Sequence, residues 1–233
     1  MGSTRFPGKP LCDLCGKPMV QWVVERALSS GVGDKVVVAT PDQEIVEACA
    51  RFGAEAVLTS ADHPSGTDRI AEVARTIAAD VYVNVQGDEP LVEPSDIVAC
   101  AAPLLADKNI EMGSVYAPCP RDEQDVPSVV KVVIEKNGYA LYFSRFPIPF
   151  PRDERSEPVK KHIGLYAYTG AVLARFSNWP QSPLETAEGL EQLRFLENGV
   201  RIRMSPGKGS ALAVDTPDQA RTVREILSTA RQI

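Results

Sequence analysis

Residues 81–90 read VYVNVQGDEP, and this stretch decides the fold of the chain. Its first five residues form a nearly continuous apolar run, which is typical of a strand buried on both faces of a parallel sheet. A second run of this kind, KVVVA, occupies residues 35–39. Because ligands of such sheets bind beyond the carboxyl ends of the strands, we expect a ligand site at the polar turn 86–89.

Helix-like and strand-like segments alternate on both sides of these strands. This alternation predicts an α/β fold in which helices cover a mostly parallel sheet. The spacing of apolar residues predicts helices over residues 18–30, 44–52, 67–78, 95–105, 185–197 and 217–230. Ser95 and Thr216 are the expected N-caps of two of these helices.

Beyond residue 112 the pattern becomes richer in strands. Asn137-Gly138 lies between β-rich runs at residues 129–134 and 139–143, and this dipeptide predicts a hairpin. Further strand-like runs cover residues 56–58, 162–168 and 200–204. We expect a single domain over residues 1–233, with a β-rich excursion at about residues 118–180.

The composition is that of a soluble globular protein, with 44% hydrophobic and 24% charged residues. A formal charge of −6 argues against a nucleic-acid surface, which usually carries a basic face. No apolar run reaches the about 18 residues that a membrane span needs, and the polar residues 1–10 predict no signal peptide. Five cysteines at irregular spacing indicate reduced thiols, so we expect a cytoplasmic protein.

The segment GSTRFPGKP at residues 2–10 has the composition of a phosphate-binding loop. Its glycines let backbone N–H groups approach a phosphate, while Arg5 and Lys9 neutralise charge. It is not a Walker A loop, because its glycines are separated by five residues and a proline replaces the magnesium-binding Ser or Thr. The alternative interpretation is a solvated basic segment.

Two aspartates occupy turns next to predicted elements. Asp88 follows the strand of residues 81–85, and Asp215 precedes the helix of residues 217–230. Such carboxylates can hold Mg²⁺, which proteins bind through few carboxylates together with substrate phosphates. Alternatively, each aspartate caps its neighbouring helix.

Two further groups of polar residues each share one face of an element. His162, Tyr166 and Tyr168 lie on one face of a strand because of their even spacing. One face of the predicted helix over residues 185–197 carries Glu185, Glu188 and Gln192, with Glu191 adjacent. The alternative interpretations are a structural histidine and a solvated helix face.

Taken together, seven segments resemble the 3-deoxy-manno-octulosonate (Kdo) cytidylyltransferases. These are STRFPGKP at 3–10, ADHPSGTDR at 61–69, VNVQGDEP at 83–90, GYALYFSR at 138–145, KHIGLYAY at 161–168, SPLETAEGLEQLR at 182–194 and VDTP at 214–217. They follow the order of the family across nearly the whole chain. The segments at 161–168 and 182–194 distinguish this family from the sialic-acid cytidylyltransferases, which share mainly the first loop.

The resemblance implies a three-layer nucleotidyltransferase fold of the nucleotide-diphospho-sugar transferase type, with a mostly parallel mixed sheet. The β-rich insertion is then expected to serve dimerisation and sugar binding. The implied reaction transfers CMP from CTP to the anomeric hydroxyl of Kdo and gives CMP-Kdo and pyrophosphate for lipopolysaccharide biosynthesis. The resemblance further implies Mg²⁺ as the cofactor and a homodimer as the active form.

The resemblance also assigns roles to individual residues. The catalytic residues are Arg5, Lys9, Asp88 and Asp215, of which the two aspartates hold the metal. CTP is bound by Ser3, Arg5, Lys9, Ser65, Gly66 and Arg69. The sugar acid is held by Gln86, Arg145, His162, Tyr166, Glu191 and Gln192, with the Arg145 guanidinium on its carboxylate.

The start of the chain departs from the family pattern. Family members begin with a strand and a turn that read roughly I-I-P-A-R-x-x-S-T-R, and Met1-Gly2 fall between that first arginine and Ser3. We therefore expect the first strand and the first phosphate-contacting arginine to be missing, with Met1 an internal methionine of the natural chain. Loss of a central strand would leave buried backbone groups unpaired, at about 1–3 kcal/mol each.

Two alternative functions stay open at this point. One is a cytidylyltransferase for a related sugar acid, such as 8-amino-Kdo or a sialic acid. The other is a truncated relative that binds a ligand without turning it over.

Overall fold

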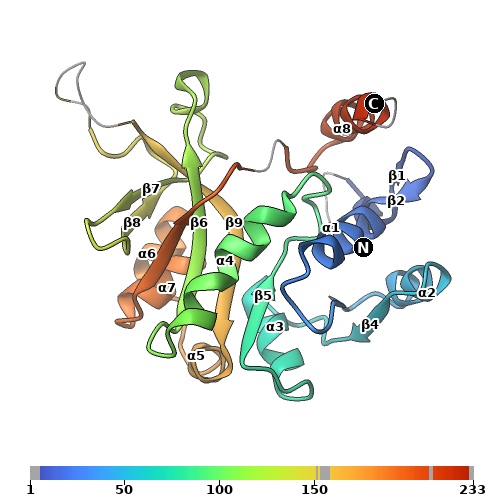
Figure 1. Ribbon diagram of the computed structural model, residues 1–233, viewed down its shortest axis with the longest axis horizontal. Helices are drawn as coiled ribbons and strands as arrows, with labels where there is room; N and C mark the ends of the chain where they lie inside the picture. The colour runs from blue at the N-terminus through green and yellow to red at the C-terminus, as the bar shows by residue number, and fades with distance from the viewer. Residues whose placement is uncertain (1–5, 151, 153–157, 210–211, 231–233) are drawn as a thin grey trace. The chain divides into compact units, whose positions relative to one another are not determined.

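Figure 1 shows the computed structural model, which describes residues 6–150, 152, 158–209 and 212–230. The chain divides into two compact units. The first unit comprises residues 1–63, 85–98 and 210–233, and the second comprises residues 64–84 and 99–209. The expectation of one cytidylyltransferase domain over residues 1–233 stays a prediction.

The first unit contains a short parallel sheet. Its strands β3 (Val37–Thr40) and β4 (Glu55–Leu58) are connected by α2 (Gln43–Arg51). Met19 and Val223 are buried in the larger of its apolar cores. The other elements are η1 (Lys9–Leu11), the hairpin strands β1 (Asp13–Leu14) and β2 (Lys17–Pro18), α1 (Met19–Ser30) and α8 (Pro217–Ala230).

A six-stranded mixed sheet forms the centre of the second unit. Its strand order is β10-β6-β9-β7-β8, and β5 pairs with β9 beside this path. β6 and β10 are parallel, whereas β9 is antiparallel to β5, β6 and β7. The strands are β5 (Val81–Asn84), β6 (Met112–Pro118), β7 (Lys131–Ile134), β8 (Ala140–Ser144), β9 (Lys160–Thr169) and β10 (Ile202–Pro206).

Helices cover both faces of this sheet and make three layers (Figure 1). On one face, α4 (Pro94–Ala106) approaches β6 so closely that a Cβ at Gly113 would lie 2.7 Å from the carbonyl oxygen of Cys100. On the other face, Phe176 and Phe195 stack 4.5 Å apart within the core. The helices of that layer are α3 (Gly66–Ala74), α5 (Gly170–Phe176), α6 (Pro183–Glu188) and α7 (Gln192–Glu197).

β9 holds the sheet together because it pairs with three strands. One of its edges pairs with β6, and the other pairs with β7 at residues 160–161 and with β5 at residues 166–169. Gly164 and Leu165 have no pairing partner on any of these strands, since the register with β6 shifts between Ser114 and Val115. Such bulges bend a strand and re-aim its side chains.

Most predicted elements are confirmed to within a few residues. The predicted helix over residues 18–30 is α1, and the Asn137-Gly138 turn joins β7 to β8 with a φ of 81° at the glycine. Thr216 caps α8, because its Oγ1 accepts from the Gln219 backbone N–H at 3.3 Å. β6, α5 and the β1–β2 hairpin are not among the predicted elements.

The single helix predicted over residues 185–197 is wrong. The chain instead forms α6 and α7. α6 ends at Glu188, and its C-cap Gly189 has a φ of 63°, in the left-handed region that glycine tolerates. Glu185 and Gln192 therefore lie on two helices rather than on one face. Ser95 is not an N-cap, because α4 already begins at Pro94.

The two strands predicted to be buried are half-buried along most of their length. In the described residues β3 pairs only with β4, and β5 only with β9, so each strand has an edge without a strand partner. The sheet of the second unit is mixed, as expected, but less parallel than predicted, because β9 opposes its three neighbours.

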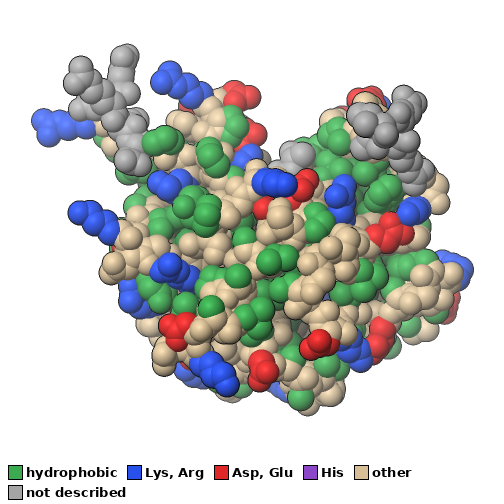
Figure 2. Space-filling view, viewed as in Figure 1, with side chains coloured by type: hydrophobic (Ala, Val, Ile, Leu, Met, Phe, Trp, Pro, Cys, Tyr) green, Lys and Arg blue, Asp and Glu red, His purple; other side chains and the backbone are tan. Residues whose placement is uncertain are grey.

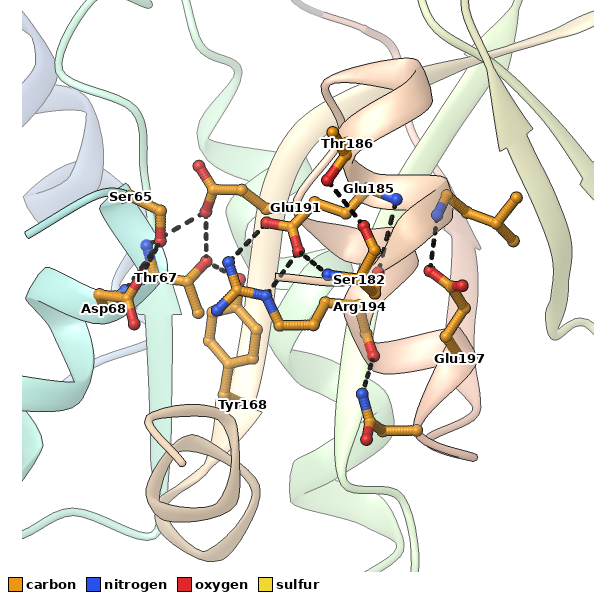
Figure 3. Close-up of polar contacts among 12 residues, drawn as sticks. Ser65, Thr67, Asp68, Tyr168, Ser182, Glu185, Thr186, Glu191, Arg194 and Glu197 are labelled. Carbon is orange, nitrogen blue, oxygen red and sulfur yellow. Dashed lines mark hydrogen bonds and ion pairs between the residues drawn. The ribbon is translucent and has the colours of Figure 1, made fainter. Parts of the chain in front are cut away.

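A buried ion pair fastens α6 to α7, as Figure 3 shows. Nε and Nη2 of Arg194 donate to the two carboxylate oxygens of Glu185 at 2.6 and 2.5 Å. Only 2% of Glu185 and 4% of Arg194 are exposed. Glu185 also forms a capping box with Ser182 at the start of α6. The pair thus fixes the corner from which Glu191 and Gln192 project.

Replacement of Glu185 by Ala leaves the Arg194 guanidinium buried without its counter-ion. We expect the free energy of unfolding, measured by urea denaturation, to fall by about 3–5 kcal/mol. The matched control is Arg221→Ala, which removes an exposed ion pair with Asp218 and should change stability by about 0.5 kcal/mol or less. Equal losses in the two variants would contradict this role of the buried pair.

Candidate functional site

The first unit brings Lys9, Asp88 and Asp215 together from three distant segments. Lys9 Nζ donates to Asp88 Oδ2 at 2.8 Å and to Asp215 Oδ1 at 3.1 Å. Lys9 opens η1, Asp88 lies in the turn that follows β5 in sequence, and Asp215 precedes α8. The Val214 backbone N–H donates to the Asp88 carbonyl at 2.8 Å and holds the two aspartate turns side by side. We call these three residues the lysine–aspartate cluster.

The ammonium group of Lys9 stays charged at neutral pH. Burial by itself lowers the pKa of Lys9, but the hydrogen bonds to Asp88 and Asp215 and their negative charges outweigh burial, so this pKa is raised. Only 13% of the Lys9 side chain is exposed, against 31% of Asp88 and 42% of Asp215. The carboxylates are therefore the more accessible members of the cluster.

Helix capping does not account for the two aspartates. Thr216, not Asp215, caps α8, and the Asp215 carboxylate accepts from Lys9. α4 begins at Pro94, too far along the chain for Asp88 to be its N-cap.

The oxygens of the cluster suit a hard divalent cation. One oxygen of each aspartate lies within 3.1 Å of the same nitrogen, so both carboxylates converge on one positive charge. Mg²⁺ prefers oxygen ligands and is commonly held by one or two carboxylates together with phosphates. Among the described residues no group of three or more His, Cys, Asp or Glu could hold a metal. Asp88 and Asp215 would therefore hold Mg²⁺ jointly with a phosphate-bearing substrate.

Three other predicted residues stay predictions. Ser3 and Arg5 lie outside the described residues. Gln86 is partly exposed in the turn that leads to Asp88, and its carbonyl accepts from the Glu89 backbone N–H at 3.2 Å.

In the second unit, three predicted sugar-binding residues form a continuous row. The His162 and Tyr166 rings on β9 have centroids 5.3 Å apart. The Tyr166 hydroxyl donates to Gln192 Oε1 at 3.2 Å, at the first residue of α7. We call His162, Tyr166 and Gln192 the polar row.

The Gln192 amide has an unused donor. Gln192 is 2% exposed, and its Nε2 donates to no group of the described residues. A buried donor without a partner costs about 1–3 kcal/mol. An acceptor on a ligand would remove this cost, which favours a binding role for the polar row.

Glu191 is held by the N-terminus of α3, as Figure 3 shows. Its Oε2 accepts from Thr67 Oγ1 at 2.8 Å and from the Thr67 backbone N–H at 3.3 Å. The positive end of the helix dipole stabilises a carboxylate at this position. The Tyr168 hydroxyl lies 3.4 Å from Thr67 Oγ1, and burial raises the pKa of Tyr168 so that it stays protonated.

The predicted CTP residues of segment 65–69 lie at the start of α3. Ser65 caps this helix: its Oγ accepts from the Asp68 backbone N–H at 3.1 Å and donates to Asp68 Oδ2 at 2.6 Å. Gly66 is the first helical residue, and the Arg69 backbone N–H donates to the Ser65 carbonyl. A cavity of about 470 Å³ adjoins this helix start and is lined in part by Ser65, Asp68 and Glu191. The CTP roles themselves stay predictions.

Arg145 is tied to the backbone by three hydrogen bonds. Nε donates to the Glu188 carbonyl at 2.7 Å, Nη1 to that of Pro127 at 3.0 Å and Nη2 to that of Gly189 at 3.2 Å. A guanidinium has five N–H groups, so two are left for a ligand. The predicted grip on the sugar carboxylate stays a prediction. In the structure Arg145 holds the turn between α6 and α7.

Two residues that orient the predicted site were not predicted themselves. Thr67 binds Glu191, which is 124 residues away in sequence. Ser114 Oγ lies 2.9 Å from His162 Nε2, across 48 residues. Only the capping pattern around Ser65 marks Thr67 in the sequence, and no local pattern marks Ser114.

Comparison with known proteins identifies the family. The cytidylyltransferase family model matches residues 1–202. A 3-deoxy-manno-octulosonate cytidylyltransferase of Trichlorobacter lovleyi is 46% identical, over 96% of this chain and 94% of that protein. The protein of the same name in Geobacter metallireducens is 47% identical, over 97% and 94%. The chain belongs to the 3-deoxy-manno-octulosonate cytidylyltransferase family.

A solved structure supports the same family. A CMP:2-keto-3-deoxy-manno-octonic acid synthetase complexed with CTP has a TM-score of 0.95 and 42% identity, over 98% of this chain and 95% of that chain. The predicted nucleotidyltransferase fold is therefore confirmed. Membership of the Kdo cytidylyltransferase family makes the chain a nucleotidyltransferase.

The surface of the described residues adds two findings. None of the described helices combines the length and apolarity needed to cross a membrane. On the face in Figure 2, the described Lys and Arg side chains are scattered among acidic and apolar ones and do not gather into one patch.

Replacement of Thr67 by Val keeps the shape of the side chain but removes its donor to Glu191. We expect the free energy of unfolding to fall by about 1.5–3 kcal/mol, because the lost hydrogen bond reaches a charged group. The control is Thr76→Val. The exposed Thr76 hydroxyl donates to the Val73 carbonyl, and its loss should change the free energy of unfolding by about 0.5 kcal/mol or less. In a Glu191→Ala background the difference between the two Val variants should vanish, because the Thr67 hydroxyl then has no carboxylate to bind. An undiminished difference in that background would contradict the contact.

Proposed function

We propose that the chain transfers CMP from CTP to the anomeric hydroxyl of Kdo and releases pyrophosphate. The observation that carries the proposal is the lysine–aspartate cluster, in which the accessible carboxylates of Asp88 and Asp215 converge on the ammonium group of Lys9. Membership of the Kdo cytidylyltransferase family supports the choice of CTP and Kdo. The same reaction would give CMP-Kdo for lipopolysaccharide biosynthesis.

The first unit supplies the phosphate chemistry in this proposal. Lys9 and Arg5 bind phosphate oxygens and neutralise part of their charge, together with Ser3 of the same loop. Asp88 and Asp215 would hold Mg²⁺, which would supply positive charge next to the phosphates of the substrate.

The second unit supplies substrate recognition. Ser65, Gly66 and Arg69 contact the cytidine, while Arg145, Glu191 and the polar row hold the sugar acid. Gln86 keeps its expected role as a sugar-binding residue. The anomeric oxygen then bonds to the α-phosphorus as the bond between this phosphorus and the bridging oxygen breaks. Pyrophosphate leaves with that bond pair, and the hydroxyl proton passes to solvent. Alignment of the two reacting groups is the main contribution of these residues.

The proposal includes a cytoplasmic homodimer. The hairpin and the segment that follows it present exposed apolar side chains, with Leu141 57%, Phe146 77% and Phe150 86% exposed. Exposed apolar side chains of this size favour an interface with another protein. The family resemblance places dimerisation in this excursion, so a second copy of the chain is the proposed partner.

The test is pyrophosphate release from CTP with Mg²⁺ and a panel of sugar acids. We expect turnover with Kdo to exceed that with 8-amino-Kdo and sialic acid, and UTP not to replace CTP. If only another sugar acid is turned over, that acid takes the place of Kdo as the proposed substrate. CTP binding without turnover of any sugar acid would favour a binding protein.

Replacement of Asp88 or Asp215 by Asn tests the metal role. Each variant should lose about 10²–10³-fold in kcat/KM, because a neutral amide oxygen is a weaker ligand for Mg²⁺ than a carboxylate and does not offset its charge. Asp218→Asn, three residues beyond Asp215 and 81% exposed at its side chain, is the matched control and should keep full activity. Equal activity of all three variants would contradict the assignment.

A further inference from the structure

Ser114 contacts two groups that limit where its single proton can lie. Its Oγ lies 2.8 Å from the Leu165 carbonyl oxygen and 2.9 Å from His162 Nε2. A carbonyl oxygen carries no proton, so the short contact to Leu165 requires the Ser114 hydroxyl to donate there. The contact to His162 therefore requires the histidine to donate from Nε2.

The contact between Ser114 and Leu165 lies at the bulge in β9. The register of β9 with β6 shifts there, and Leu165 pairs with no residue of β5, β6 or β7. Ser114 on β6 is 0% exposed, and its hydroxyl donates to the Leu165 carbonyl. This bond uses the single proton of Ser114.

We propose that Ser114 is a positioning residue that fixes His162 in the neutral Nε2–H tautomer and leaves Nδ1 as an acceptor for a hydroxyl of the bound sugar acid. This inference rests on the proposed function for the identity of the ligand. It adds a specificity rule to that function, because an unprotonated Nδ1 accepts from a hydroxyl and repels a carboxylate.

The surroundings of the ring favour the neutral form. The His162 ring contacts Ser114 on β6, Phe143 on β8 at 4.9 Å and Tyr166 on β9 at 5.3 Å, and none of these three side chains is a carboxylate or a cation. Burial lowers the pKa of His162 to about 3, without a contribution from any charged neighbour. The ring is therefore neutral across the working pH range.

The polar row then offers an acceptor and a donor to one ligand. His162 Nδ1 is the acceptor, and the unused Gln192 Nε2 is the donor, while Gln192 Oε1 accepts from Tyr166. Hydroxyl groups can satisfy both, because each hydroxyl donates once and accepts twice. The row should therefore recognise the hydroxyls of the sugar acid, while its carboxylate binds elsewhere.

Long-range ¹H–¹⁵N NMR of the labelled, ligand-free protein measures the tautomer directly. The chain has two histidines, so a His63→Gln variant assigns the signals of His162. We expect a protonated Nε2 and an unprotonated Nδ1 that do not change between about pH 8 and 5. An Nδ1–H tautomer, an even mixture of tautomers or titration in this range would overturn the proposal.

Ser114→Ala removes the acceptor that holds the Nε2 proton. We expect loss of the single tautomer and a roughly tenfold higher KM for the sugar acid, with the KM for CTP unchanged. Ser228→Ala, an exposed serine of α8 that donates to the Glu225 carbonyl, is the control and should match the parent chain. An unchanged tautomer in Ser114→Ala would overturn the proposal, and if that variant does not fold, the tautomer of the parent chain decides alone.

Addition of Kdo separates this inference from the proposed function. If Kdo is turned over, its addition should shift the Nδ1 resonance as Nδ1 accepts a hydrogen bond, whereas CTP alone should not. Turnover without a shift would overturn the acceptor role but leave the proposed function intact. If no sugar acid is turned over, the proposed function fails and the acceptor role fails with it, although the tautomer is still measured.

Discussion

The pairing of β9 with three strands is the constraint on which the second unit depends. This strand joins β5 and β7 on one edge to β6 on the other, so the backbone of three neighbours is satisfied through it. Where its register shifts, the Ser114 hydroxyl contacts both the Leu165 carbonyl and His162. The sheet thus fixes the positions of His162 and Tyr166, which is more precise than a loop would allow.

The sequence predicted the elements whose patterns are continuous and failed where one residue redirects the chain. α1 and α8 follow unbroken helical spacing and lie where expected. The apolar spacing of residues 185–197 also continues, but Gly189 turns the backbone, and the Glu185–Arg194 pair holds the corner. β6 was not predicted because tertiary contacts, rather than a local pattern, explain two of its residues. Gly113 leaves room for α4, and Ser114 binds the carbonyl of Leu165, which is distant in sequence.

The same division applies to the candidate site. Asp88 and Asp215 were predictable because each stands at a turn beside a strongly patterned element, and the structure brings both to Lys9. Arg145 was expected to bind a carboxylate. Its guanidinium group instead donates to three backbone carbonyls, two of them at the turn around Gly189, which was not predicted from the sequence. Thr67 and Ser114 act through partners that are far away in sequence, so no local pattern reveals them.

The chain is proposed to transfer CMP from CTP to the sugar acid Kdo. The most direct test is mass spectrometry of the products formed from CTP, Mg²⁺ and Kdo. We expect a CMP–Kdo ester that appears in equal amount with pyrophosphate. Unchanged CTP, or release of CMP or CDP without a sugar adduct, would contradict it.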